Sequence, residues 1–165
     1  MKRYVRALAA TLATAFVTAP SILPAKGATP APFTSTGWRL TCASNLNCRV
    51  SERILDRANG GVFVALTVHL VNKAKQPDLI IQLPLGIAVD QPTTLAIGTL
   101  PISRYVISTC ERTGCFAGAT LSAAQLAEFR RVKVVKLAFQ TLTKRTVTVT
   151  VPMVGFAATY ARMLR

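Results

Sequence analysis

Apolar and polar residues alternate along much of the chain from Gly37 onward, which is the period of a β-strand rather than that of a helix. The alternation is clearest in residues 61–71, 78–83, 135–140 and 144–151. In the last of these segments the alternating residues are valine and threonine, whose β-branched side chains favour strands. We therefore predict a half-buried strand in each segment, with one aliphatic face turned toward a core.

Two other segments have helical spacing. Residues 122–130 begin with Ser122 and Gln125 placed as a capping box, in which two side chains bond the free backbone groups at the start of a helix. Residues 155–164 place Phe156 and the later large side chains at helical intervals, and basic residues stand at the end, where the helix dipole favours them. A short helix is predicted in each segment.

Turn-forming residues separate the predicted strands at nearly regular intervals, as in residues 59–61, 84–86 and 90–92. Many short strands with regularly spaced turns are typical of an antiparallel sandwich. The predicted fold class is therefore mainly β, an antiparallel β-sandwich with one or two short helices.

The first 27 residues differ from the rest of the chain. Three basic residues precede an uncharged run at residues 7–23, and small residues follow, which is the layout of a secretory signal peptide. The run is too weakly apolar for a permanent membrane span, and Ala25 and Gly27 suit the −3 and −1 positions of a cleavage site. We expect a cleaved signal peptide at residues 1–27, an extended lead-in at residues 28–36 and one domain at residues 37–165.

The charge of the chain is strongly positive. The 20 Lys and Arg stand against 6 Asp and Glu, a net charge of +14. Removing residues 1–27 removes four basic residues and no acidic ones, so the mature chain would carry 16 − 6 = +10. The excess therefore belongs to the folded domain and predicts acidic partners. Nucleic acid is not expected among them, because the protein is exported.

Four cysteines, Cys42, Cys48, Cys110 and Cys115, form two close pairs in the sequence. An even number in an exported chain indicates two disulfides. Pairing within each close pair is favoured, because both loops contain residues that turn easily. A long link such as Cys42–Cys110 would gain more chain entropy and stays open. The spacing fits neither a zinc site nor a redox C-x-x-C motif well, so we expect no metal and no cofactor.

Four short motifs follow one another along the chain. They are a W-x-x-x-C element at residues 38–42, Leu-Pro-Leu-Gly-Ile at residues 83–87, a C-x-x-x-G-C loop at residues 110–115 and Gly-Phe-Ala-Ala at residues 155–158. In this order they resemble the invasion associated locus B family, exported proteins of Gram-negative bacteria. The resemblance spans residues 37–163, almost all of the mature chain.

The resemblance implies an immunoglobulin-like β-sandwich in the periplasm or at the outer membrane, in a family without an agreed molecular activity. Two positions depart from the pattern of the family. Glu52 stands where the family often has glutamine, and residues 130–133, Arg-Arg-Val-Lys, replace a turn that often holds glycine. The second departure adds charge to a turn, so a surface role there would be particular to this chain.

Candidates for catalysis are few. The chain has one histidine, His69, and six carboxylates without the spacing of a paired acid and base. His69 lies on the mixed face of its predicted strand, where a lone histidine is usually a surface or hydrogen-bonded residue. Glu52 and Asp56 stand near Arg53 and Arg57, which predicts ordinary surface pairing. We therefore expect no active site and no enzymatic activity.

The most suggestive surface is basic. Six cations are expected around one hairpin: Arg130, Arg131, Lys133, Lys136, Lys144 and Arg145. Alternation turns Lys136 outward, and the turn pair Lys144 and Arg145 could share its face. The plain interpretation is a solvated surface that maintains solubility. The functional interpretation is a patch that binds anions, and those available to an exported protein are lipopolysaccharide, anionic lipid and acidic glycan.

We accordingly expect an exported, non-enzymatic envelope protein that acts as a binding or interaction module, in envelope function or in host-cell interaction. Its partner would be an envelope or host protein, or an anionic envelope component. The alternative is a small periplasmic hydrolase or transferase that uses His69 with a nearby carboxylate. That alternative requires a concave polar pocket around His69, whereas a flat, solvent-exposed setting would exclude it.

Overall fold

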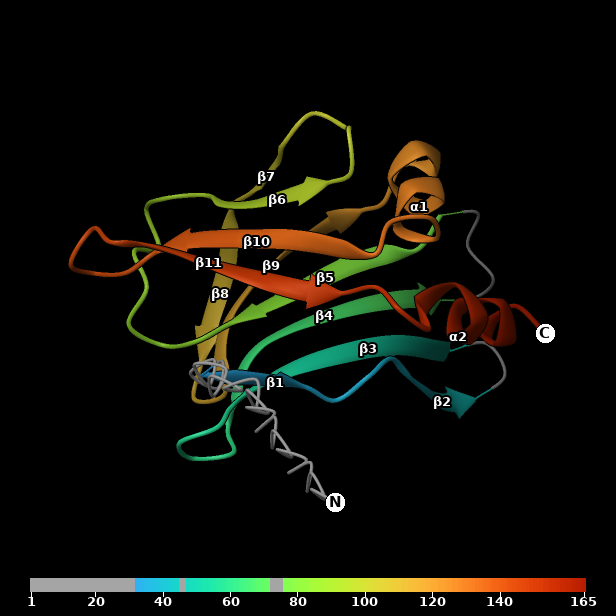
Figure 1. The fold of residues 1–165 in the computed structure, drawn as a ribbon, viewed down its shortest axis with the longest axis horizontal. Helices are drawn as coiled ribbons and strands as arrows, with labels where there is room; N and C mark the ends of the chain where they lie inside the picture. The colour runs from blue at the N-terminus through green and yellow to red at the C-terminus, as the bar shows by residue number, and fades with distance from the viewer. Residues whose placement is uncertain (1–31, 45–46, 72–75) are drawn as a thin grey trace, which may run out of the picture. The chain divides into compact units, whose positions relative to one another are not determined.

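The computed structural model describes residues 32–44, 47–71 and 76–165, which form two antiparallel sheets and two helices (Figure 1). The predicted signal peptide and the first residues of the lead-in lie outside the described residues. No helix within the described ranges is long and apolar enough to cross a membrane. The prediction of an antiparallel β-sandwich with short helices and two disulfides is confirmed.

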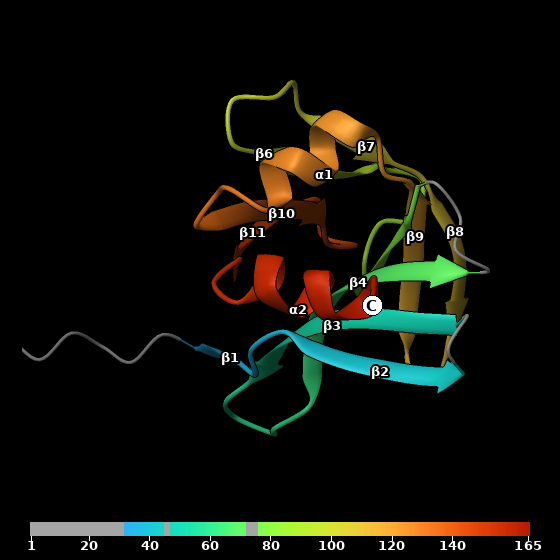
Figure 2. The same ribbon diagram turned by 90° about the vertical axis from the view of Figure 1, so that its right-hand side faces the viewer.

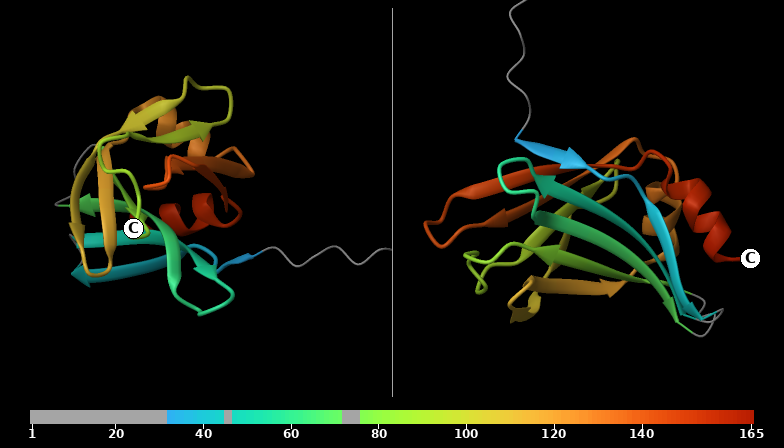
Figure 3. Two further views of the ribbon diagram at one scale, coloured as in Figure 1. Left: turned by 90° about the vertical axis from the view of Figure 1, so that its left-hand side faces the viewer. Right: turned by 90° about the horizontal axis from the view of Figure 1, so that it is seen from below.

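The larger sheet has seven strands, in the order β1-β3-β4-β5-β9-β8, and β2 pairs with β3 on the same edge as β1. Its strands are β1 (Phe33–Ser35), β2 (Arg39–Ser44), β3 (Asn47–Asp56), β4 (Val62–Val71), β5 (Asp78–Leu83), β8 (Ile107–Glu111) and β9 (Gly114–Thr120). Two of the predicted strands are therefore confirmed as β4 and β5. Figure 3 shows β1 and β2 following one another along β3, as one edge strand with a break.

The smaller sheet has four strands, in the order β11-β10-β6-β7. They are β6 (Thr93–Ile97), β7 (Ser103–Tyr105), β10 (Val134–Gln140) and β11 (Thr146–Pro152). The two predicted strands in this part of the chain are confirmed as β10 and β11. The strand β11 begins later than predicted because Lys144 has a φ of 58° and closes the hairpin turn.

The aliphatic faces of both sheets meet in one core. Alternate residues in the middle of β4 (Val64, Leu66 and Val68) and in β10 (Val135, Leu137 and Phe139) are buried there, as the alternation predicts. At the edge of the core, the Trp38 ring contacts Phe156 edge to face with centroids 4.7 Å apart. Trp38 Nε1 also donates to the carbonyl of Pro152 at 2.9 Å, which ties the edge of the larger sheet to the end of β11.

Both predicted helices are confirmed. The helix α1 (Ala123–Phe129) begins at the predicted capping box: Gln125 N donates to Ser122 Oγ at 3.1 Å, and Ser122 N donates to Gln125 Oε1 at 2.9 Å. The helix α2 (Phe156–Met163) buries an aromatic and aliphatic stripe. Both helices lie at the end of the sandwich away from the β10–β11 turn, and α2 lies between the edges of the two sheets (Figures 1 and 2).

The prediction that Glu52 is a surface residue is wrong. It is 1% exposed and points inward from β3, because strand alternation and not helical spacing decides its side. Its Oε1 accepts hydrogen bonds from Ser35 Oγ at 2.8 Å, Thr36 N at 3.0 Å and Gly37 N at 3.1 Å, while its buried Oε2 has no partner. Glu52 therefore stabilises the chain at the break between β1 and β2 through these hydrogen bonds.

Both disulfides are the local pairs. Cys42–Cys48 joins residues directly opposite each other on β2 and β3, and Cys110–Cys115 does the same on β8 and β9. Their Cα atoms are 4.0 Å and 3.9 Å apart, as in the closely spaced pairs of antiparallel sheets. A long link is excluded by geometry, because β2 and β8 lie at opposite edges of the sheet.

Candidate binding surface

The four-stranded sheet carries positive charge and no negative charge. Its strands and their connecting turns lie in residues 93–105 and 134–152, which contain no Asp or Glu. Residues 129–165 as a whole contain eight Lys and Arg and no acidic residue. Four of the six carboxylates lie instead on strands of the larger sheet: Glu52, Asp56, Asp78 and Glu111. Among the strands of the two sheets, negative charge is thus confined to the larger sheet, while Asp90 lies in the β5–β6 loop and Glu128 in α1.

Lys136 lies in the middle of the outer face of the four-stranded sheet. Its neighbours in β10 are buried and Lys136 itself is exposed. The register places it between Thr150 of β11 and Ala96 of β6. In the adjacent row Ala138 is followed across β6 and β7 by Thr94 and Arg104. We call this surface the basic face; its outward residues are Thr94, Ala96, Arg104, Lys136, Ala138, Thr148 and Thr150.

Three predicted cations lie at the helix end of β10. Arg130 caps α1, and Arg131 forms a 2.6 Å ion pair with Glu128. Burial raises the pKa of the Tyr160 phenol, and the charge of Arg130 opposes that rise. The carbonyl of Lys133 accepts a hydrogen bond from Met153 N at 2.8 Å, so this loop runs beside the end of β11.

The other two predicted cations, Lys144 and Arg145, lie in the β10–β11 turn. The turn is closed by hydrogen bonds from Thr141 N to the Arg145 carbonyl at 2.9 Å and from Lys144 N to the Thr141 carbonyl at 2.8 Å. It contacts the loop between β5 and β6 through a bond from Leu142 N to the Gly86 carbonyl at 3.1 Å. The turn is therefore fixed against the β5–β6 loop, at the end opposite the helices.

The structure brings the six predicted cations onto one hairpin but not into one cluster. Three precede β10, one lies within it and two follow it. Five residues separate Lys136 from Thr141, about 17 Å of strand, so the cations form an elongated strip. The strip also gains Arg104, which sequence reasoning missed. Nothing in the sequence marks Arg104, because its position depends on the strand order β10-β6-β7.

A groove of about 620 Å³ lies on the outer face of the larger sheet. Its lining, from β4, β5, β8 and β9, includes His69, Asp78, Ile80, Ser108, Glu111 and Phe116. His69 and Asp78 stand opposite each other in the register of β4 and β5. His69 therefore lines an open, mainly apolar depression and not the concave polar pocket that the enzyme alternative requires.

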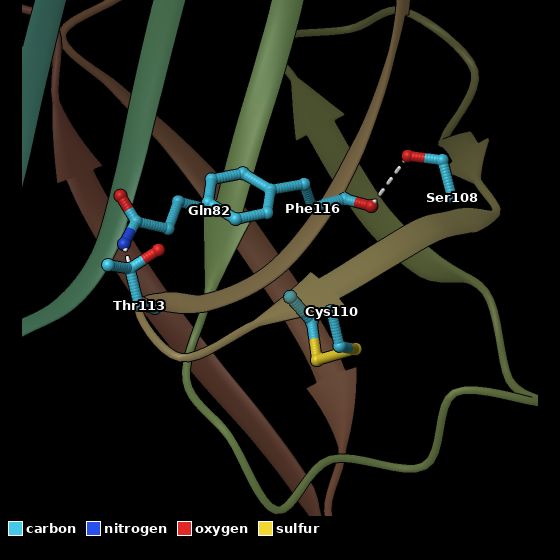
Figure 4. The surroundings of a disulfide bond; sticks show 6 residues. Gln82, Ser108, Cys110, Thr113 and Phe116 are labelled. Atoms are coloured by element: carbon cyan, nitrogen blue, oxygen red, sulfur yellow. Dashed lines mark hydrogen bonds between the residues drawn. A yellow bond between two sulfur atoms is a disulfide. The ribbon is translucent and has the colours of Figure 1, made fainter.

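The groove holds no connected catalytic pair among the described residues. His69 Nε2 lies 2.6 Å from Asn47 Oδ1, so this nitrogen is already hydrogen-bonded. Within the described ranges no ion pair joins His69 to a carboxylate. The Ser108 hydroxyl donates to the carbonyl of Phe116 at 2.9 Å and not to an imidazole (Figure 4). A serine nucleophile needs an oriented base, so the groove is suited to contact with a ligand rather than to covalent chemistry.

Metal binding finds no support in the geometry. Across the part of the chain that the structure describes, no three His, Cys, Asp or Glu side chains gather closely enough to hold a metal ion. All four cysteines are committed to disulfides.

Comparison with known proteins adds a family and a fold. The sequence model of the invasion associated locus B (IalB) protein family matches residues 38–164. Among solved structures, the chain is similar to the crystal structure of invasion associated protein b from Bartonella henselae, with a TM-score of 0.69 and 22% identity over 77% of this chain and 91% of that chain. At this identity the likeness shows the fold alone. None of the curated protein sequences compared with the chain matches it.

Proposed function

The chain belongs to the invasion associated locus B family, and on this premise we propose that it is a non-enzymatic binding protein of the bacterial envelope. Its signal peptide is removed on export to the periplasm or the outer membrane. There the basic face binds an anionic partner. Two features support export: the layout of residues 1–27 and the two disulfides, which persist in oxidising compartments.

The division of charge between the two layers carries the proposal. Within the described residues the one ion pair joins Arg131 to Glu128, so the remaining cations of the β10–β11 hairpin have no carboxylate bound to them. Cations that share one face attract an anionic surface over about a Debye length, roughly 8 Å at physiological salt. Solubility requires net charge but does not require that one layer be free of acids. If the four-stranded sheet recognises an anion, this explains both its unpaired cations and its lack of acidic residues.

Four classes of partner offer the required charge. They are lipopolysaccharide, anionic phospholipid, acidic glycan and an envelope or host protein with an acidic surface. Each would be bound with an affinity that falls as salt rises, because surface charges are screened.

The test combines direct binding with capture in the cell. Protein purified after export is titrated with lipopolysaccharide, phosphatidylglycerol vesicles and a sulfated glycan at low and at high salt. In parallel, crosslinking in living cells is followed by identification of the captured molecules. We expect salt-sensitive binding to at least one anion and a captured partner with an anionic surface. The proposal fails if none of the anions binds at low salt and crosslinking captures no partner.

A second candidate function is a small hydrolase or transferase that uses His69, which lines the groove on the larger sheet. It predicts slow hydrolysis of an activated ester such as p-nitrophenyl acetate, with a rate that depends on the His69 imidazole. The rate should then disappear in His69→Ala and change in Asn47→Ala, which removes the hydrogen-bond partner of the ring. Equal rates in His69→Ala and the unaltered protein would exclude this candidate.

A further inference from the structure

Two of the three most exposed large hydrophobic side chains among the described residues lie at the ends of the β10–β11 hairpin, one in its turn and one in the turn that follows β11. They are Val154, 77% exposed, and Leu142, 71% exposed; the third is Val106, 76% exposed, between β7 and β8. An isolated exposed aliphatic residue needs no explanation. Two such residues at the ends of one hairpin that lacks acidic residues are less expected, and their positions indicate what the hairpin can bind.

Val154 lies just beyond the helix end of the basic face. The hydrogen bond from Met153 N to the Lys133 carbonyl continues the pairing of the hairpin one residue past Pro152. Met153 is buried, and Val154, in the turn that follows it, is exposed. Val134, which is 43% exposed, lies opposite Pro152 and extends this apolar end of the face.

Leu142 occupies the other end of the same face. Thr141 pairs with the buried Ile87, and Leu142 N donates to the Gly86 carbonyl. Leu142 therefore lies in the turn just beyond β10, where it is 71% exposed. Eight residues separate Val134 from Leu142, about 26 Å of strand. The two apolar ends thus flank the whole length of the basic face.

Cations stand beside each apolar end. Lys144 and Arg145 follow Leu142 in the turn, and Arg130 and Lys133 lie in the loop beside Val154. The acidic groups near these ends are Asp90, in the loop that contacts the turn, and Glu128, which is paired with Arg131. The net charge at both ends is therefore positive.

This combination fits the surface of a bilayer better than it fits a soluble anion. A soluble acidic glycan can neutralise the cations, but it offers nothing apolar to Val154 and Leu142. An anionic phospholipid surface offers phosphates to the cations and the threonine hydroxyls, and hydrocarbon just beneath them to the aliphatic side chains. The strand pairing makes the face broad rather than pointed, which suits contact with a planar partner.

The geometry points to the basic face as a membrane-docking surface that lies flat on an anionic phospholipid bilayer, with Val154 and Leu142 inserted among the headgroups at its two ends. The inference rests on the proposed function and names phospholipid as the anionic partner. It concerns surface contact, in which no segment crosses the bilayer.

The test measures cosedimentation with phosphatidylcholine vesicles, with and without phosphatidylglycerol. The double variant Val154→Ser and Leu142→Ser keeps every charge and is expected to lower binding to the anionic vesicles about tenfold, because two aliphatic contacts are lost. Ile80→Ser removes an exposed aliphatic side chain from the outer face of the larger sheet, away from the basic face, and should leave binding unchanged. Lys136→Gln should lower binding about fivefold, since one cation near an anionic bilayer contributes that factor.

The outcomes separate this inference from the proposed function. Vesicle binding that is equally strong in the double serine variant overturns membrane docking. If the unaltered protein still binds a sulfated glycan or lipopolysaccharide in a salt-sensitive way, the proposed function stands without membrane docking. Equal binding to neutral and anionic vesicles also overturns the inference, because the cations would then have no part in it. The expected result is a loss on anionic vesicles and no loss on the soluble glycan.

Discussion

Glu52 is the clearest exception to the alternation of apolar inward and polar outward residues along the strands. A carboxylate at an inward position of a strand would be costly without partners. Here the break between β1 and β2 leaves three donors, and a single oxygen of Glu52 accepts from all of them. The other oxygen is buried without a partner. The side chain therefore holds the start of the domain in place while one of its polar atoms is unsatisfied.

Replacing Glu52 separates the contribution of its accepting oxygen from the cost of its buried, unpaired oxygen. Glu52→Ala should lower the free energy of unfolding by about 2–4 kcal/mol, because three donors lose their acceptor and a cavity opens. Glu52→Gln keeps an accepting oxygen and removes the negative charge of the buried carboxylate, so its stability should stay within about 1 kcal/mol of the unaltered protein. Urea unfolding of both variants measures the difference. Equal losses in both would mean that Glu52 does not act through its accepting oxygen.

At the scale of elements, the strands and helices with a regular period could be predicted from sequence. The strands β4, β5, β10 and β11 and both helices follow from alternation, helical spacing and the capping box. The interrupted pair β1 and β2 could not be predicted, because Glu52 breaks the apolar pattern of β3 and the break is closed by long-range hydrogen bonds. The positions of β8 and β9 depend on close backbone approaches that have no periodic signal.

Gly114 marks one such approach. Its φ is 139°, and a Cβ atom there would lie 2.4 Å from the carbonyl oxygen of Leu83. Gly114→Ala should therefore cost about 2 kcal/mol or more in unfolding free energy. Gly60, with a φ of 69° and nothing within 4 Å of a built Cβ, is the matched control, and Gly60→Ala should cost only about 1 kcal/mol. Thermal melting distinguishes the two; similar losses would show that backbone conformation alone matters.

Each disulfide closes a short hairpin loop, so each should contribute modestly and independently. Replacing Cys42 and Cys48 together by serine, or Cys110 and Cys115 together, should cost about 2 kcal/mol on the chain-entropy account. The sequence separations of 6 and 5 are nearly equal, so the two losses should be similar. Removing both pairs should give nearly the sum, because they lie at opposite edges of the sheet. Denaturant unfolding measures all three, and a loss far above the sum would contradict independent hairpins.

At the scale of the whole molecule, the main feature is the separation of charge between layers. The sequence shows a basic chain and six cations around one hairpin, and both observations hold. It could not show that the four-stranded sheet is free of acids or that Arg104 joins Lys136 on one face, because both depend on which strands pair. Nor could it show the groove beside His69, which residues from four strands assemble.

The central claim is that the face of the four-stranded sheet, and not the net charge of the protein, recognises anions. The decisive measurement compares two charge-matched double variants in binding to phosphatidylglycerol vesicles and lipopolysaccharide at one fixed salt concentration. Lys136→Glu with Arg104→Glu reverses two charges on the basic face. Arg49→Glu with Arg53→Glu reverses two exposed charges on β3 of the larger sheet. The account predicts that the first pair lowers affinity at least about tenfold while the second leaves it nearly unchanged. Equal losses from both pairs would contradict it.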